Sequence, residues 1–293
     1  MSDLTVVAGP SSPELAARVA AHLDAALVQA ELRVFSDGES KIRLAGPVAG
    51  RCVIVQSTHP PTDSHLLQAM MMARKCADSG AKVCAVIPYL AYARQDRAFL
   101  EGEVVSVALV AKLLEASGVA SVVTVDIHSE AALAYFVKIK NISSIPLLAL
   151  HAAKMNLSGP IAVSPDAGGA ARAEEFARLL KTDSIALKKS RDRTTGDVTV
   201  DPNIGADVSG RDAILVDDMI SSGGSIVKAA EVLKNNGAGR VYTMCAHALM
   251  IGDATKKIQA AGVQEIIATN SIPGAHAKVD LGPALADAAR AIL

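Results

Sequence analysis

The sequence predicts an α/β protein of two similar domains, each a mainly parallel β-sheet flanked by helices. Short β-branched runs alternate with longer helical patterns along nearly the whole chain of 293 residues. One order of segments also occurs twice: strand, loop, helix, glycine and strand, with the glycine at Gly80 and again at Gly237. The length suits two domains of roughly 100 to 200 residues each.

The individual elements follow from the apolar pattern. Apolar runs rich in β-branched residues have the length of buried strands, and several helical patterns end in a glycine, which favours the left-handed backbone that closes a helix. The expected strands are residues 4–8, 52–56, 83–87, 122–125, 161–163, 184–187, 213–216 and 241–245. The expected helices are residues 64–79, 104–117, 169–181, 225–236 and 283–292.

A polar, proline-containing segment at residues 141–147 interrupts this alternation. We therefore place the domain boundary there, which gives an N-terminal domain of residues 1–143 and a C-terminal domain of residues 144–293. The last expected helix is a candidate to pack on the N-terminal domain.

Composition excludes several classes of partner. The 29 basic and 30 acidic residues nearly cancel, so no overall field attracts nucleic acid or an anionic membrane. The four cysteines lack CxxC spacing and lie in apolar runs, which indicates reduced core residues of a cytoplasmic protein. There is no basic leader, and Lys112 and Glu115 interrupt the longest apolar stretch, so neither secretion nor membrane spanning is expected.

The most specific local feature is a Ser/Gly loop between an apolar strand and a helix in the second domain. Gly223 and Gly224 let the backbone approach an anion, and the helix offers free N–H groups and the positive end of its dipole. Ser221, Ser222 and Ser225 add hydroxyl donors. The loop is therefore a candidate site for the 5-phosphate of a sugar.

Two adjacent carboxylates, Asp217 and Asp218, precede this loop. Carboxylates accept hydrogen bonds, which suits the vicinal 2- and 3-hydroxyls of a ribose. A capped turn with solvated aspartates is the alternative, and the combination of both motifs favours the phosphosugar site. The first copy of the unit has Gln56 and Ser57 at these positions, so we expect that copy to have lost the site.

Two polar loops of the first domain contain side chains that suit a nucleotide. One offers an aromatic face for a base together with carboxylate acceptors, and the other offers arginine forks for phosphate. A core aromatic and an exposed salt-bridge cluster explain either loop taken alone. The candidate nucleotide-binding residues are Phe35, Asp37, Gly38, Glu39, Arg94, Gln95, Asp96 and Arg97.

Taken together and in order, these motifs resemble the ribose-phosphate pyrophosphokinase family over essentially the whole chain. The segments 56–58, 126–128 and 164–166 complete the pattern. Ser221 and Ser222 stand where many members have Asp and Thr, so the loop alone is equally similar to that of type I phosphoribosyltransferases. The resemblance implies a type I phosphoribosyltransferase-like fold for both domains, with ATP and ribose 5-phosphate as substrates.

The resemblance also implies a cofactor, an assembly and catalytic residues. It assigns Mg²⁺ to His128 and Asp166 in the interdomain cleft, with Asp126 supporting His128, and leaves Ala167 without a role. It implies a homo-oligomer in which ATP lies between the loop of residues 94–97 and a neighbour's loop of residues 35–39. A Lys-x-Arg triplet, here Lys189 and Arg191, would open a mobile loop over the reacting phosphates; a solvated charge cluster is the alternative.

The implied reaction transfers the β,γ-diphosphate of ATP to the 1-hydroxyl of ribose 5-phosphate, giving 5-phosphoribosyl 1-pyrophosphate and AMP. A phosphoribosyltransferase is one alternative, but it leaves residues 35–39 and 94–97 without a purpose. A non-catalytic regulatory relative is the other, and the presence of Lys189, Arg191 and both metal-ligand candidates argues against it.

Overall fold

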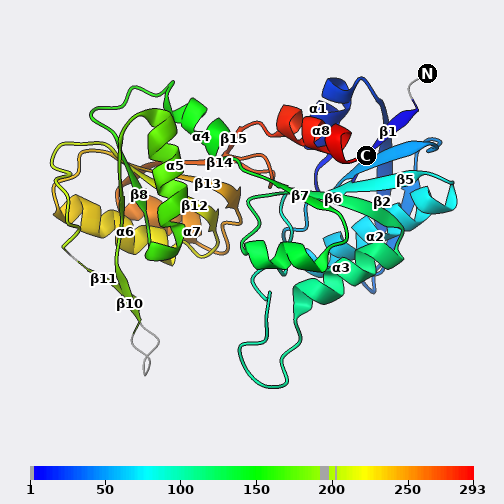
Figure 1. Ribbon diagram of the computed structural model, residues 1–293, viewed down its shortest axis with the longest axis horizontal. Helices are drawn as coiled ribbons and strands as arrows, with labels where there is room; N and C mark the ends of the chain where they lie inside the picture. The colour runs from blue at the N-terminus through cyan, green and yellow to red at the C-terminus, as the bar shows by residue number, and fades with distance from the viewer. Residues whose placement is uncertain (1–2, 192–197, 202) are drawn as a thin grey trace. The chain divides into compact units, whose positions relative to one another are not determined.

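The structure, a computed structural model, describes residues 3–191, 198–201 and 203–293; for residues 189–191 and 198–200 it describes the backbone. The chain divides into two compact units. The N-terminal unit consists of Met1–Ser143, Ser271–Pro273 and Leu281–Leu293, and the C-terminal unit of Ser144–Asn270 and Gly274–Asp280. Figure 1 labels their helices and strands.

The described residues of the N-terminal unit form a seven-stranded sheet of order β3-β2-β1-β4-β5-β6-β7. All neighbours are parallel except β2 and β3, which form an antiparallel hairpin. Its strands are β1 (Leu4–Ala8), β2 (Ala26–Val34), β3 (Ser40–Leu44), β4 (Arg51–Val55), β5 (Lys82–Val86), β6 (Val119–Val125) and β7 (Ile139–Ile142). Its helices are α1 (Pro13–Leu23), α2 (Thr62–Asp78), α3 (Ser106–Ala116), α8 (Gly282–Ile292) and the 3₁₀ turn η1 (Glu130–Tyr135).

The described residues of the C-terminal unit form a six-stranded parallel sheet of order β15-β14-β13-β12-β8-β9 and a small antiparallel pair, β10 and β11. The strands are β8 (Ile161–Ser164), β9 (Asp183–Ala186), β10 (Lys189–Arg191), β11 (Val198–Val200), β12 (Ala213–Ile220), β13 (Val241–Ala248), β14 (Val263–Thr269) and β15 (Ala277–Val279). The helices are α4 (Ile145–Ala152), α5 (Ala170–Leu180), α6 (Gly224–Asn235), α7 (Ala254–Ala260) and the 3₁₀ turn η2 (Ala167–Gly169).

Helices cover both faces of each large sheet. In the N-terminal unit α2 and α3 pack on one face, while α1 and α8 pack together on the other (Figure 1). In the C-terminal unit α6 and α7 share one core with the sheet, and α4 and α5 share another. Strands buried on both faces explain the continuous apolar runs of the sequence. The predicted α/β class with mainly parallel sheets is therefore confirmed.

One expected strand proves too short. The sequence predicts a strand over residues 213–216, whereas β12 continues to Ile220, because its pairing with β13 extends to Ile220 and Ala248. Its pairing with β8 on the other side ends earlier, at Leu215 and Val163. Asp217 and Asp218 therefore lie within the last part of the strand, where β13 pairs with it.

The core contains the four cysteines, all as buried free thiols, as the sequence predicts. Among the described residues, no helix combines the length and the apolar character that crossing a bilayer requires.

Candidate active site

The Ser/Gly loop joins β12 to α6 in the C-terminal unit. Gly223, the residue before α6, has φ +78°, and a Cβ added there would lie 2.9 Å from the Ile258 side chain. Both the left-handed backbone and this close contact require glycine. At Gly224 an added Cβ would meet nothing within 4 Å, and the N-cap residue Gly223 has no side chain to cap the first turn. The helix N-terminus is thus exposed to a ligand on this side.

Asp217 and Asp218 lie beside an arginine that no sequence motif singles out. Arg172 Nη1 is 3.4 Å from Asp217 Oδ1 and 3.9 Å from Asp218 Oδ1. The Asp218 backbone N–H also donates to Asp217 Oδ1 at 2.9 Å. Burial, followed by the charge of Asp218, raises the pKa of Asp217 to about 7, and Arg172 acts in the opposite direction.

Asp166 follows β8, the strand next to β12. Ser164 Oγ donates to the Asp166 carbonyl at 2.6 Å, and Asp166 Oδ1 accepts from the Gly169 N–H at 3.3 Å. Asp166 thus caps η2 with one carboxylate oxygen. Because parallel strands end at the same edge of a sheet, the structure brings Asp166 and Asp217 to one edge of the C-terminal unit.

In the N-terminal unit, residues 35–39 form the turn of the β2–β3 hairpin. Phe35 N–H donates to the Glu39 carbonyl at 2.9 Å, and Glu39 N–H donates to Asp37 Oδ1 at 3.1 Å. Gly38 has φ +92°, which favours glycine at this position. The Phe35 ring is 38% exposed and lies under the Arg33 guanidinium at 4.8 Å.

The hairpin projects beyond the parallel part of its sheet. Residues 26–29 of β2 pair with β1, whereas residues 30–34 pair with β3. Two strands, β1 and β4, separate β2 from β5, so at about 4.8 Å per strand the ends of β2 and β5 are about 14 Å apart. The turn of residues 35–39 and the loop of residues 94–97 therefore follow strands that are not neighbours in the sheet.

The segment after β5 that leads to residues 94–97 is held by a buried threonine. Thr58 Oγ1 donates to the Tyr89 carbonyl at 2.8 Å and accepts from the Ala91 N–H at 2.8 Å. Gln56, Ser57 and Thr58 are all fully buried. Thr58 therefore fixes the segment that leads to residues 94–97.

Asp96 connects this loop to the segment after β6 that contains His128. Its carboxylate accepts from Ser129 Oγ at 2.6 Å, and Tyr135 Oη donates to its carbonyl at 2.9 Å. The hydrogen bond from Ser129, with smaller contributions from Arg97 and His128, lowers the pKa of Asp96 despite its partial burial. Arg94, Arg97 and His128 are exposed, and the charges of Arg97 and His128 act on the Asp96 carboxylate.

Lys189 and Arg191 belong to β10, whose backbone pairs with β11 through Lys189–Val200 and Arg191–Val198. The sequence predicts a loop here, and the structure shows that short antiparallel strands begin and end it. Residues 192–197 of that loop lie outside the described residues, and the catalytic roles of Lys189 and Arg191 stay predictions.

No group of three or more His, Cys, Asp and Glu side chains that suits a metal occurs among the described residues. Mg²⁺ commonly takes only one or two carboxylates from the protein and completes its shell with water and substrate phosphates. The Asp166 carboxylate is an oxygen donor of this kind, and only one of its oxygens caps η2. The donor chemistry therefore fits Mg²⁺ at Asp166, and the additional ligand role of His128 stays a prediction.

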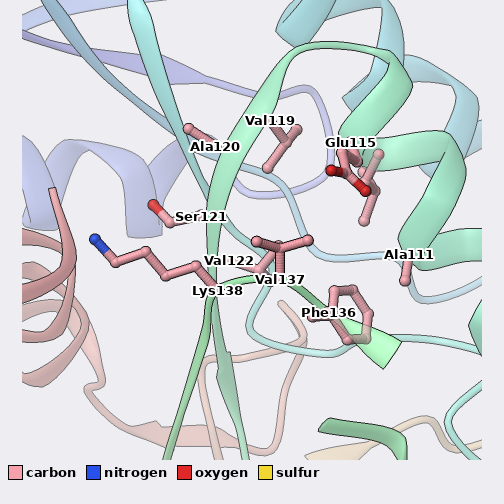
Figure 2. Close-up of a pocket in the computed structure, with 10 residues that line it drawn as sticks. Ala111, Glu115, Val119, Ala120, Ser121, Val122, Phe136, Val137 and Lys138 are labelled. Carbon is pink, nitrogen blue, oxygen red and sulfur yellow. The ribbon is translucent and has the colours of Figure 1, made fainter. Parts of the chain in front are cut away.

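A pocket of about 100 Å³ lies elsewhere in the N-terminal unit, between α3, β6 and the start of β7 (Figure 2). Figure 2 shows Phe136, Val137 and Glu115 around it. None of the candidate site residues lines this pocket, so it does not mark the candidate site.

Acidic residues at the end of a parallel strand, followed by a Ser/Gly loop and an uncapped helix N-terminus, are typical of α/β proteins that bind phosphorylated ligands. Comparisons with known proteins narrow this class. A family model described as the N-terminal domain of ribose phosphate pyrophosphokinase matches residues 4–118, and one described as the phosphoribosyl synthetase-associated domain matches residues 181–283.

Relatives and a solved structure match nearly the whole chain. The ribose-phosphate pyrophosphokinase of Methanothermobacter thermautotrophicus is 38% identical over 96% of this chain and 98% of its own length. That of Vibrio cholerae is 40% identical over 93% of this chain and 88% of its own length. The crystal structure of phosphoribosylpyrophosphate synthetase from Mycobacterium smegmatis matches with a TM-score of 0.87 and 29% identity, over 99% of this chain and 98% of that one. The chain belongs to the ribose-phosphate pyrophosphokinase family, which is a family of enzymes.

Proposed function

We propose that this protein transfers the β,γ-diphosphate of ATP to the 1-hydroxyl of ribose 5-phosphate, releasing 5-phosphoribosyl 1-pyrophosphate and AMP. The observation that carries the proposal is the 38% identity to a named ribose-phosphate pyrophosphokinase over 96% of this chain and 98% of that relative. A phosphoribosyltransferase is not favoured, because the match includes the whole N-terminal unit with its candidate nucleotide loops.

The sugar phosphate would bind in the C-terminal unit. The N–H groups of the first turn of α6 and the hydroxyls of Ser221, Ser222 and Ser225 would hold the 5-phosphate. Asp217 and Asp218 would accept hydrogen bonds from the 2- and 3-hydroxyls. Only residues 221–223 separate the end of β12 from the start of α6. One ribose phosphate could therefore contact the aspartates through its hydroxyls and the loop through its 5-phosphate.

The reaction is an in-line attack of the sugar O1 on the β-phosphorus, with AMP as the leaving group. Such transfers depend mainly on positioning and on charge stabilisation. Arg94 and Arg97 would bind the phosphates of ATP, and Phe35 would stack on its base. Lys189 and Arg191 would neutralise the charge that grows on the transferred group and on the departing AMP oxygen.

Mg²⁺ is proposed as the cofactor, with Asp166 and His128 as its protein ligands. When bound, it supplies neutralisation of phosphate charge. Asp166 suits this role because its carboxylate offers oxygen donors and because the Ser164 hydroxyl and the Gly169 N–H fix its backbone and its side chain.

A homo-oligomer with ATP at a subunit interface is part of the proposal. The β2–β3 hairpin supports it, since it projects from its sheet with Leu32, Val34 and Phe35 at least one-third exposed. We also propose a cytoplasmic location, on the basis of four reduced cysteines.

The first test is an assay with ATP, Mg²⁺ and ribose 5-phosphate that follows AMP and 5-phosphoribosyl 1-pyrophosphate. We expect stoichiometric formation of both. The variant Lys189→Ala should lower kcat by about 10²- to 10³-fold, because it removes a cation at the growing charge. Lys188→Ala, its sequence neighbour, is the matched control and should retain activity.

Two results would contradict the proposal in different ways. Consumption of 5-phosphoribosyl 1-pyrophosphate with a purine or pyrimidine base, without any need for ATP, would assign the protein to the phosphoribosyltransferases. Normal product formation by Lys189→Ala but not by Lys188→Ala would retain the reaction and move the catalytic lysine by one position.

A further inference from the structure

Arg172 comes from a different part of the chain than the two aspartates that it approaches. It lies in the first turn of α5, after β8, whereas Asp217 and Asp218 lie in β12. The adjacency of β8 and β12 in the sheet brings these segments together. One nitrogen, Nη1, is within 4 Å of a carboxylate oxygen of each aspartate, at 3.4 and 3.9 Å. A single cation thus bridges two carboxylates.

The backbone before α5 leaves space for this guanidinium. Gly169 precedes the helix, and a Cβ added to it would lie 3.3 Å from Arg172 Nη1 and 2.5 Å from Ser164 Oγ. A side chain at this position would therefore displace Arg172 or the end of β8. Gly169 in turn donates to Asp166, which fixes the turn that leads into α5.

The electrostatics explain why two adjacent carboxylates need such a partner. The side chains of Asp217 and Asp218 are only 20% and 8% exposed, and that of Arg172 is 23% exposed. Two like charges at this depth repel each other, and burial disfavours both. The raised pKa of Asp217 reflects these two causes, and Arg172 opposes it. Without the cation, Asp217 would keep its proton to a higher pH, and a protonated carboxyl has less acceptor capacity for a sugar hydroxyl.

We propose that Arg172 is a positioning residue for the sugar: its guanidinium holds the Asp217 and Asp218 carboxylates side by side as acceptors for the vicinal hydroxyls of ribose 5-phosphate. This inference rests on the proposed function of the site and adds a residue to it. Arg172 Nη1 donates a long hydrogen bond to Asp217 Oδ1 at 3.4 Å and forms an ion pair with Asp218 at 3.9 Å, so both contacts can tighten or shift when the sugar binds. Arg172 acts through the carboxylates and contacts neither reacting phosphate.

The test compares Arg172→Gln with Arg172→Lys, and uses Arg178→Gln as the control. Arg178 is an exposed arginine near the end of the same helix. Arg172→Gln should raise KM for ribose 5-phosphate by about 10- to 100-fold, because a hydrogen bond to a charged group contributes about 1.5 to 3 kcal/mol. KM for ATP and kcat should change by less than about threefold, since the loss is confined to sugar binding. Arg172→Lys should recover most of the loss, and Arg178→Gln should match the unmodified protein.

Calorimetric titration with ribose 5-phosphate in the absence of ATP separates this inference from the proposed function. Failure of the unmodified protein to form AMP would overturn the proposed reaction, while weaker binding by Arg172→Gln would still support the role of Arg172. An unchanged KM for ribose 5-phosphate, or a loss confined to kcat, would overturn the inference. Circular dichroism checks folding; should Arg172→Gln unfold, Arg172→Met retains the aliphatic stem and takes its place in both measurements, with the same outcomes.

Discussion

At the scale of single residues, Asp217 is both the proposed ligand of the sugar and a cost to the folded state. Burial, followed by the charge of Asp218, raises its pKa to about 7, whereas an unfolded aspartate has a pKa of about 3.9. Between these values the folded protein keeps a proton that the unfolded chain has released. Raising the pH from about 4 to about 7 therefore lowers the free energy of unfolding, and above pH 7 the full cost is present.

We predict that Asp217→Asn stabilises the protein while it weakens sugar binding. Asparagine carries no charge to bury and still offers Oδ1 to the Asp218 N–H. The gain in the free energy of unfolding should be larger at pH 8 than at pH 5, by on the order of 1 to 3 kcal/mol. Denaturant unfolding at both pH values measures this difference. An equal gain at pH 5 and pH 8 would show that the Asp217 charge is not the cause.

The sequence predicts part of this site, namely the residues that are close together along the chain. The aspartate pair and the Ser/Gly loop are adjacent along the chain, so a local pattern predicts that they share a site. Arg172 is 45 positions from Asp217 in the chain, and its contact depends on β8 and β12 being neighbours in the sheet. No local pattern specifies strand order, which is why the sequence did not predict Arg172.

At the scale of elements, the predicted strands are those with continuous apolar runs. β4 and β5 are buried at four of their five positions, so burial on two faces produces a strong signal. The antiparallel pairing of β2 with β3 was not predicted, because β2 has only one buried residue and mixes polar and apolar positions without a clear period. An exposed hairpin is stabilised by its pairing, to which a hydrophobic pattern is insensitive.

Helix α8 follows the C-terminal unit along the chain but packs in the N-terminal unit. Its residues Leu285, Ala289 and Ile292 are buried, and it packs against α1 and near β5, β6 and β7. Two lysines of the N-terminal unit donate to its end: Lys82 Nζ to the Leu293 carbonyl at 2.6 Å and Lys138 Nζ to the Ile292 carbonyl at 2.5 Å. Helix α8 is therefore part of the packed core of the N-terminal unit.

We predict that Leu285→Ala destabilises the N-terminal unit by about 2 to 4 kcal/mol, because it leaves a cavity in a closed core. Hydrogen exchange followed by mass spectrometry should show faster exchange in α1 and in β5 to β7, with β12 to β14 unchanged. Ala291→Ser, a change at an exposed position of the same helix, is the control and should leave both units protected. Faster exchange in β12 to β14 alone would contradict this prediction and would mean that the helix stabilises the C-terminal unit.

At the scale of the whole molecule, the similarity to the family spans both units, yet the two nucleotide loops follow strands that are not neighbours in the sheet. In the proposed oligomer, the projecting hairpin of one subunit would complete the site that contains Arg94 and Arg97 of another. The sequence resemblance implies this arrangement, and the strand order of a single chain agrees with it because β1 and β4 separate the loops.

Mixing two variants that bind ATP weakly tests this arrangement. Phe35→Ala removes the stacking ring and Arg94→Ala removes a guanidinium that would bind phosphate, so each variant alone should have a raised KM for ATP and little activity at low ATP. In mixed oligomers, a site that takes residues 94–97 from the first variant and residues 35–39 from the second contains both intact loops. For a random two-fold dimer about half of the oligomers are mixed and half of their sites are intact, so activity should recover to about one quarter.

The control for this experiment is a mixture of Phe35→Ala with Asp37→Ala. Both changes lie in the same hairpin turn, so no pairing of subunits restores an intact site, and no recovery is expected. Native mass spectrometry must confirm that mixed oligomers form in both cases. Mixed oligomers of Phe35→Ala and Arg94→Ala without recovered activity would place both loops in the ATP site of a single chain, and the hairpin would then need another partner.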